Sequence, residues 1–155
     1  MSDDVLRDQL ITLLRGGEAH APIEDVIRGF PAEHAAVRVD GVVHTPWRLL
    51  EHLRIAQWDI LEFSRDPRHV SPEFPRGYWP EGDAPPSPDA WDASVERFCA
   101  DLEAMEDLVA DPTNDLMAPI PHGDGQTLLR EAMLVADHNA YHVGQLVLIW
   151  KAAES

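Results

Sequence analysis

Apolar residues recur every three to four positions in several long segments of this 155-residue chain. The clearest series is Trp91, Val95, Phe98, Leu102, Met105 and Val109. This alternation places its members along one side of an α-helix, which we expect to stop at Asp111 and Pro112. A helix with one apolar side must bury that side against another element, and no segment shows a strand pattern of comparable quality. The pattern therefore restricts the fold to packed helices.

A second helix is predicted from Pro46 to Ser64. Its apolar stripe is Leu49, Leu53, Ala56, Ile60 and Phe63. Thr45 is a suitable N-cap, and Pro46 fits the first helical position because its missing N–H has no partner there. Asp66 and Pro67 end the segment.

Two further helices complete the pattern. The last one is predicted to start after Thr127 and to reach Ala152, with Leu134, Tyr141 and Leu148 on its inward side. The first is predicted from Leu6, Leu10, Leu13, Leu14 and the stretch 22–30, and is broken or kinked at Gly16 and Gly17. We therefore predict one all-α domain over residues 1–155, a four-helix bundle with long ordered loops.

The connection between the second and third helices contains many prolines, so it cannot be helical. It also carries Phe74, Tyr78 and Trp79, an aromatic content that a disordered linker rarely has. We expect an ordered loop against the bundle. The sequence is consistent with two roles for this loop: it packs across a long connection, or it covers a site.

Charge and composition exclude several classes of function. The net charge of −16 repels phosphate backbones and anionic lipids, so we expect neither nucleic-acid nor membrane binding. No apolar run approaches the roughly 20 residues that cross a bilayer. The single cysteine, Cys99, cannot form an internal disulfide, which favours a reduced, cytoplasmic location. We interpret Cys99 as a packing residue and not as a reactive thiol.

Histidines on inward helix faces point to a metal. His52 lies on the apolar stripe of the second helix, and His138 and His142 lie one turn apart on the last helix, followed by Gln145. Each buried polar group without a partner costs about 1–3 kcal/mol, and one divalent cation would satisfy all of these imidazoles. Three protein ligands would leave a position for water or substrate, a pattern typical of catalytic sites.

The other histidines do not join this pattern. Four of them fall in predicted loops and are expected to be solvated: His34, His44, His69 and His122. His20 follows the break at Gly16 and Gly17, from where its side chain can approach the site.

Several neighbours are candidates for supporting roles. Asp59 and Glu131 lie two turns from His52 and His138, on faces from which a carboxylate can accept a hydrogen bond from a ligating imidazole. Gly144 inside a helix costs about 1 kcal/mol relative to alanine, which indicates crowding by a neighbouring helix or a ligand. Gln145 offers both a donor and an acceptor.

The segment TPWRLLEHLRIAQWDILEF and the C-terminal segment TLLREAMLVADHNAYHVGQLVLIW together resemble the DinB-like superfamily of small bacterial four-helix-bundle metal proteins. The likeness extends from Thr45 onward and includes the YWP loop. It implies a site of His52, His138 and His142 for nickel, zinc or another divalent ion, and often a homodimer. Characterised relatives include thiol S-transferases and thiol-dependent isomerases, so a low-molecular-weight thiol is a further candidate cofactor.

Three hypotheses of function follow from these residues. The first is a metal-dependent enzyme acting on a small molecule by thiol S-transfer or hydrolysis, with Tyr141, Gln145 and Asp59 as candidates to orient substrate or move protons. The second is a non-catalytic metal-binding stress-response protein whose ion is structural. The third is a bundle with a buried histidine network and no metal.

Overall fold

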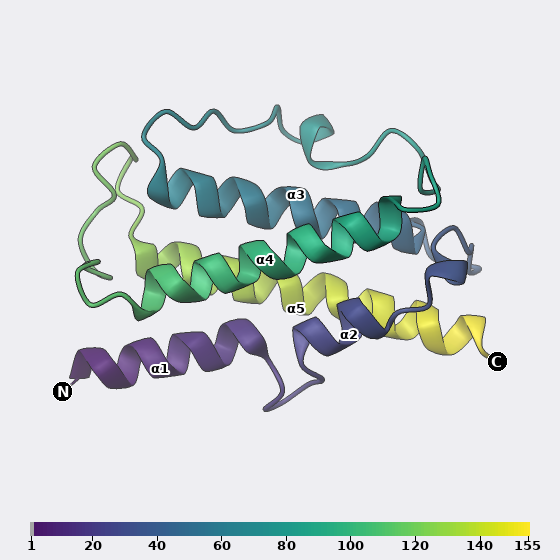
Figure 1. Ribbon diagram of the computed structural model, residues 1–155, viewed down its shortest axis with the longest axis horizontal. Coiled ribbons are helices and arrows are strands. Elements are labelled where there is room, and N and C mark those ends of the chain that lie inside the picture. The colour runs from purple at the N-terminus through teal and green to yellow at the C-terminus, as the bar shows by residue number, and fades with distance from the viewer. Residues whose placement is uncertain (1) are drawn as a thin grey trace.

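The computed structural model describes residues 2–155, which form helices and loops without a β-strand (Figure 1). The elements are α1 (Ser2–Arg15), α2 (Ile23–Gly29), α3 (Pro46–Arg65), α4 (Ala90–Ala110) and α5 (Leu128–Ala153), with short 3-10 turns η1 (Ala32–His34) and η2 (Arg76–Tyr78). The predicted all-α class is confirmed. Within this described range, every helix is too short or too polar to cross a membrane.

The first helix of the bundle consists of two separate pieces. In Figure 1, α1 and α2 follow one another along the same side of the molecule, and both contact α4 and α5. The break at Gly16 and Gly17 is confirmed, because both glycines have left-handed backbone, with φ of 70° and 94°. Leu13 at the end of α1 is 51% exposed, so it does not belong to the buried stripe.

Parallel packing of α3 and α4 explains the long loop between them. Both helices run in the same direction in Figure 1, so the chain must return along the full length of α3 before α4 begins. A helix of this length spans about 30 Å, a distance that no tight turn can cover. The loop 66–89 spans this distance and lies along α3. Its residues therefore surround the centre of that helix.

The predicted helix starts and the core of α4 are confirmed. Thr45 Oγ1 accepts from the Arg48 N–H at 3.3 Å, and Thr127 Oγ1 accepts from the Arg130 N–H at 3.1 Å. All of the predicted α4 stripe is buried. On α3, Leu49, Leu53 and Ala56 are buried, whereas Ile60 and Phe63 are only partly covered.

The predicted inward side of α5 is wrong for two residues. Tyr141 and Leu148 are each 68% exposed, and the core side consists of Ala132, Val135, Ala136, Asn139, His142, Val143, Leu146 and Ile149. The reason is that α5 carries apolar residues on two faces. Spacing alone cannot decide which of two stripes is buried.

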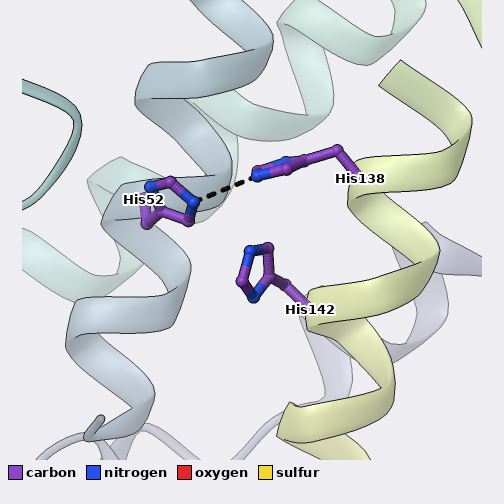
Figure 2. Close-up of side chains that lie close together, drawn as sticks. All are labelled: His52, His138 and His142. Atoms are coloured by element: carbon purple, nitrogen blue, oxygen red, sulfur yellow. Dashed lines mark hydrogen bonds between the residues drawn. The ribbon is translucent and has the colours of Figure 1, made fainter. Parts of the chain in front are cut away.

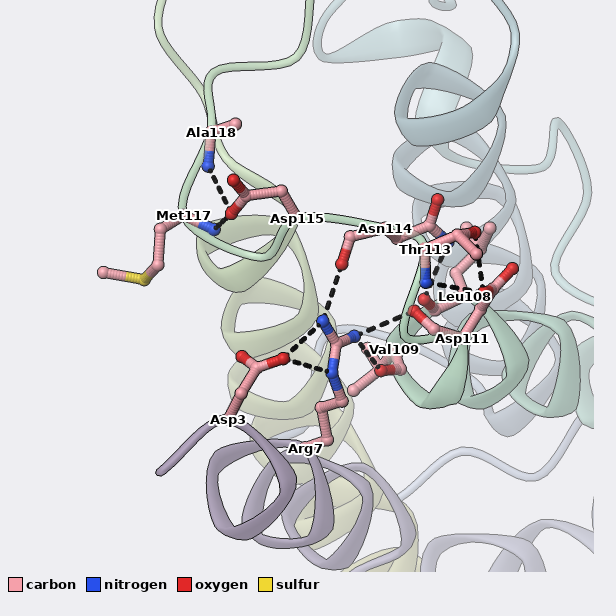
Figure 3. Close-up of polar contacts among 10 residues, drawn as sticks. All are labelled: Asp3, Arg7, Leu108, Val109, Asp111, Thr113, Asn114, Asp115, Met117 and Ala118. Carbon is pink, nitrogen blue, oxygen red and sulfur yellow. Dashed lines mark hydrogen bonds and ion pairs between the residues drawn. The ribbon is translucent and has the colours of Figure 1, made fainter. Parts of the chain in front are cut away.

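A buried arginine joins the start of α1 to the end of α4 (Figure 3). The Arg7 guanidinium, in a residue only 5% exposed, donates to the carbonyl oxygens of Val109 at 2.7 Å, Asp111 at 3.0 Å and Asn114 at 2.7 Å. Asp3 supplies the balancing carboxylate at 2.8 Å. These bonds satisfy one carbonyl in the last turn of α4 and two in the segment that directly follows the helix.

Candidate metal centre

The histidines at 52, 138 and 142 meet between α3 and α5. Figure 2 shows the three rings directed toward one point, His52 from α3 and the other two from α5. One ring nitrogen from each lies within 4.8 Å of the others, and the Nε2 atoms of His52 and His138 are 3.0 Å apart. The turn between His138 and His142 aligns both residues with the same part of α3.

The His52 ring is oriented by the loop. Its Nδ1 lies 2.8 Å from the carbonyl oxygen of Tyr78. A carbonyl oxygen can only accept, so Nδ1 carries the proton and donates. In a neutral imidazole the remaining nitrogen, Nε2, then has a free lone pair, and it faces the other two histidines.

The His142 ring is oriented in the same way by its own helix. Its Nδ1 lies 2.6 Å from Oε1 of Gln145, an oxygen that can only accept. Nδ1 therefore donates, and the Nε2 lone pair of His142 is left free. The sequence analysis named Gln145 as a candidate for a supporting role. In the structure Gln145 orients His142 by this hydrogen bond and is not itself part of the histidine cluster.

An aromatic lid covers the His52 side of the cluster. The Trp79 indole is stacked on His52 with centroids 3.8 Å apart and planes 1° from parallel. His44 stacks on the same indole at 4.2 Å, and the Arg48 guanidinium carbon lies 5.6 Å from its centroid. The loop therefore covers the site, and does not only pack across the bundle. The expectation of a solvated His44 is wrong.

Burial keeps these imidazoles neutral. Desolvation lowers the pKa of His138 to about 4, with further contributions from the neighbouring His142 and His52. Desolvation also lowers the pKa of His52 and of His142, against the hydrogen bonds to Tyr78 and Gln145 that favour their charged forms. The pKa of His44 is lowered by burial and then by the charge of Arg48. Neutral imidazole is the form that binds a metal.

Asp59 supports the loop and does not touch the histidine cluster. Its carboxylate accepts from the Tyr78 hydroxyl at 2.6 Å and from His69 Nε2 at 2.7 Å. The His69 side chain is only 7% exposed, so the expectation that His69 is solvated is wrong. The acceptor at His52 is therefore the Tyr78 carbonyl and not Asp59. Glu131 is buried and pairs with Arg130 at 2.5 Å.

The remaining candidates lie at the edge of the site or away from it. The exposed Tyr141 ring meets His142 edge-on at 4.9 Å. His20 is exposed and hydrogen-bonds Ala21, and His122 is exposed and bonds Phe63, so neither belongs to the cluster. Gly144 is exposed and a Cβ there would meet nothing within 4 Å, so the predicted crowding is absent.

The donor set fits a divalent cation. Two of the imidazoles have their outer nitrogen tied to an oxygen acceptor, the arrangement that commonly orients histidine ligands. Nitrogens bound to one ion at 2.0–2.1 Å are about 3.0–3.4 Å apart, and the His52 and His138 nitrogens are separated by 3.0 Å. The cluster can hold a metal ion.

A family model described as the DinB superfamily matches residues 7–146. The chain belongs to the DinB superfamily. No curated protein and no solved structure gives a match. A DinB-like helical bundle with a cluster of three histidines fits a metal-binding protein, as the resemblance of the two helix segments implied.

Proposed function

We propose that this DinB-like protein is a metal-dependent enzyme whose divalent cation is held by Nε2 atoms of His52, His138 and His142. The observation that carries the proposal is the pair of Nδ1 hydrogen bonds, to Tyr78 and to Gln145. Each of these bonds removes Nδ1 from competition and directs a lone pair into the cluster. The Nε2 atoms of His52 and His142 are thereby left as acceptors, the form in which they can bind one ion together with His138.

The reaction class we propose is thiol S-transfer or hydrolysis on a small molecule. When bound, a divalent cation supplies Lewis acidity that keeps a thiol deprotonated or makes water a stronger nucleophile at neutral pH. The protein contributes orientation and exclusion of water, because Trp79 covers His52 and loop 66–89 covers α3. Tyr141, exposed beside His142, is our candidate to orient a substrate at the entrance.

Nickel or zinc is the proposed ion, since three imidazoles suit both. Copper binds such ligands more tightly than either, so the order of affinity alone does not identify the metal. Gln145 and Asp59 act in this proposal as positioning residues, Gln145 through His142 and Asp59 through Tyr78.

A non-catalytic metal protein is the second candidate. The cluster joins α3 to α5 beneath the loop, so an ion there would also fasten three parts of the fold. In that case the ion would lack an exchangeable position, and chelation would lower the melting temperature without loss of any activity.

Elemental analysis of protein isolated without an affinity tag is the first test, and we expect one nickel or zinc per chain. His138→Ala should abolish the metal, and His20→Ala, an exposed histidine outside the cluster, should not. Metal-free wild-type protein that also fails to take up nickel or zinc would overturn the proposal.

Cobalt substitution then separates the two candidates. An absorption spectrum that changes on adding a thiol or azide indicates an open coordination position and supports an enzyme, to be followed by assays of thiol conjugation and of ester and amide hydrolysis. An unchanged spectrum supports the structural ion.

A further inference from the structure

A buried pair of side-chain amides joins α3 to α5 away from the histidine cluster. Gln57 and Asn139 are each 1% exposed, and Asn139 Nδ2 donates to Gln57 Oε1 at 2.9 Å. Gln57 Nε2 donates in turn to the carbonyl oxygen of Phe98 on α4 at 2.7 Å. The two amides therefore connect α3, α4 and α5 through the core.

The hydrogen bond to Phe98 fixes the orientation of both amides. A carbonyl oxygen can only accept, so the NH2 group of Gln57 faces Phe98 and its oxygen faces Asn139. Turning either amide over would bring two acceptors together. Asn139 Oδ1 is then the only buried side-chain nitrogen or oxygen atom within residues 2–155 that has no hydrogen-bond partner.

Stability does not explain this arrangement. A buried oxygen without a partner is destabilising, whereas two apolar side chains of similar shape in place of Gln57 and Asn139 would leave no polar atom unpaired. A buried polar contact that costs stability is one known means of specifying how packed helices align.

The apolar residues of α5 do not determine the rotation of this helix about its axis. Val135, Val143 and Leu146 belong to a face that is buried in the core. A second face contains Tyr141 and Leu148, which are each 68% exposed. The apolar pattern therefore does not single out the rotation that the structure shows.

Asn139 distinguishes these two faces. Tyr141 lies about 200° around the helix from Asn139, so a rotation that buried Tyr141 would carry Asn139 to solvent and leave Gln57 unpaired in the core. His142 lies only about 60° around the helix from Asn139. The rotation that pairs Asn139 with Gln57 therefore also directs His142 toward His52.

We propose that Gln57 and Asn139 are positioning residues of the metal centre, which set the rotation and register of α5 so that His52, His138 and His142 face one point. Gln57 lies five residues beyond His52, about 7.5 Å along α3, so the amide contact and the histidine contact hold α5 at two separate heights. The inference rests on the proposed metal site, and the amides act through the placement of α5.

Three variants should differ in stability according to the number of unpaired buried atoms. Gln57→Met leaves both polar groups of Asn139 unpaired, whereas Asn139→Leu exchanges one unpaired oxygen for another, that of Gln57. The double variant leaves none. Urea denaturation of the metal-free proteins should place Gln57→Met below wild type, Asn139→Leu close to it, and the double variant at or above it.

Zinc affinity should not follow this order. If the double variant presents its histidines correctly in one molecule of about ten, its apparent affinity falls about tenfold although its fold is no less stable. Competition titration with a zinc indicator measures this. Leu146→Met, a volume-conserving change at a fully buried residue of α5, is the matched control and should keep wild-type affinity.

Amide NMR of the metal-free proteins supplies a readout that needs no metal. We expect one set of α5 signals for wild type and for Leu146→Met, and several sets or broadened signals for the double variant. Wild type that takes up no zinc would overturn the proposed function alone, and the α5 signals would still test the two amides.

Two results would overturn the positioning role. One is a double variant with wild-type zinc affinity and a single set of α5 signals. The other is a double variant less stable than Gln57→Met, because the amides would then contribute to stability alone.

Discussion

Tyr78 holds His52 through its backbone and α3 through its side chain. Its carbonyl oxygen accepts from His52 Nδ1 at 2.8 Å, across 26 residues of sequence, and its hydroxyl donates to the buried Asp59 at 2.6 Å. Both bonds reach α3, so a loop residue fixes the orientation of an imidazole in the helix. The structure thus makes the histidine cluster depend on the loop.

Removing the Tyr78 hydroxyl should loosen the loop. In Tyr78→Phe the Asp59 carboxylate keeps His69 but loses one donor, and we expect a loss of about 1–3 kcal/mol in the free energy of unfolding of the metal-free protein. Zinc affinity should fall as well, because the Tyr78 carbonyl is less well fixed. Urea denaturation and calorimetric titration measure the two effects. Tyr141→Phe removes the hydroxyl of an exposed tyrosine and is the matched control. Equal losses of stability and of zinc affinity in both variants would contradict the role assigned to Tyr78.

The oxygen of Gln145 should control metal affinity. Gln145→Ala leaves His142 Nδ1 without its acceptor, and outer hydrogen-bond partners of this type are worth about 10–100-fold in affinity. Gln145→Glu keeps an oxygen acceptor and should retain more of the affinity than alanine does. Competition titration with a zinc indicator measures both, with the exposed Gln9→Ala as control. An affinity unchanged in Gln145→Ala would exclude this role.

The metal-free protein should lose stability as pH falls from about 6.5 toward 4. Burial lowers the pKa of His138 from its ordinary 6.5 to about 4, so between these values the unfolded chain binds a proton that the folded one does not. The free energy of unfolding therefore rises with pH in this window, by at most about 1.4 kcal/mol per unit for this group.

Urea denaturation in the presence of chelator, repeated across this pH range, tests the expectation. His138→Gln removes one titrating group and should flatten the dependence relative to wild type, whereas His20→Ala should not. Parallel curves for wild type and His138→Gln would show that His138 does not titrate with a lowered pKa.

The regular helices and the three histidines could be predicted from the sequence because both depend on local spacing. The α4 stripe has one apolar face, so periodicity assigned it correctly. The α5 helix has two such faces, and the exposed residues Tyr141 and Leu148 were assigned to the core because period carries no information on which face meets a partner.

The loop contribution could not be predicted in this way. Proline-rich segments have no period, so nothing local places Trp79 on His52, or His44 on the same indole. The available sequence signal was indirect. Parallel α3 and α4 require a return connection along α3, and two of its aromatic residues, Tyr78 and Trp79, contact that helix, whereas Phe74 is exposed. His44 lies just before the N-cap of α3, where sequence position alone indicates a solvated loop.

Cys99 should be inert in the folded protein. Burial raises the pKa of its thiol to about 11, and only the thiolate is reactive. Alkylation by iodoacetamide at pH 8 should be slow in the native state and fast in urea, as measured by mass spectrometry. Cys99→Ala should therefore keep any thiol-dependent activity, since the reacting thiol is an added one. Loss of that activity with an intact fold would place Cys99 in the chemistry.

Arg7 should be the most important charged side chain for stability outside the histidine cluster. Arg7→Ala leaves the carbonyls of Val109, Asp111 and Asn114 without their donor and separates α1 from the end of α4. Hydrogen bonds to a charged group are worth about 1.5–3 kcal/mol each and do not add, so we expect a loss of about 3 kcal/mol or more. Arg7→Lys should recover only part, because an ammonium cannot reproduce the planar fork that reaches several oxygens.

Chemical denaturation with Arg68→Ala as control tests this role. Arg68 has a side chain 90% exposed and a single surface partner, so its loss should cost less than about 1 kcal/mol. Metal binding by Arg7→Ala, measured under conditions where it is folded, should match wild type, because Arg7 lies at the α1–α4 contact and the histidines lie between α3 and α5. Equal stability of the Arg7 and Arg68 variants would mean that water replaces the guanidinium at these carbonyls without cost.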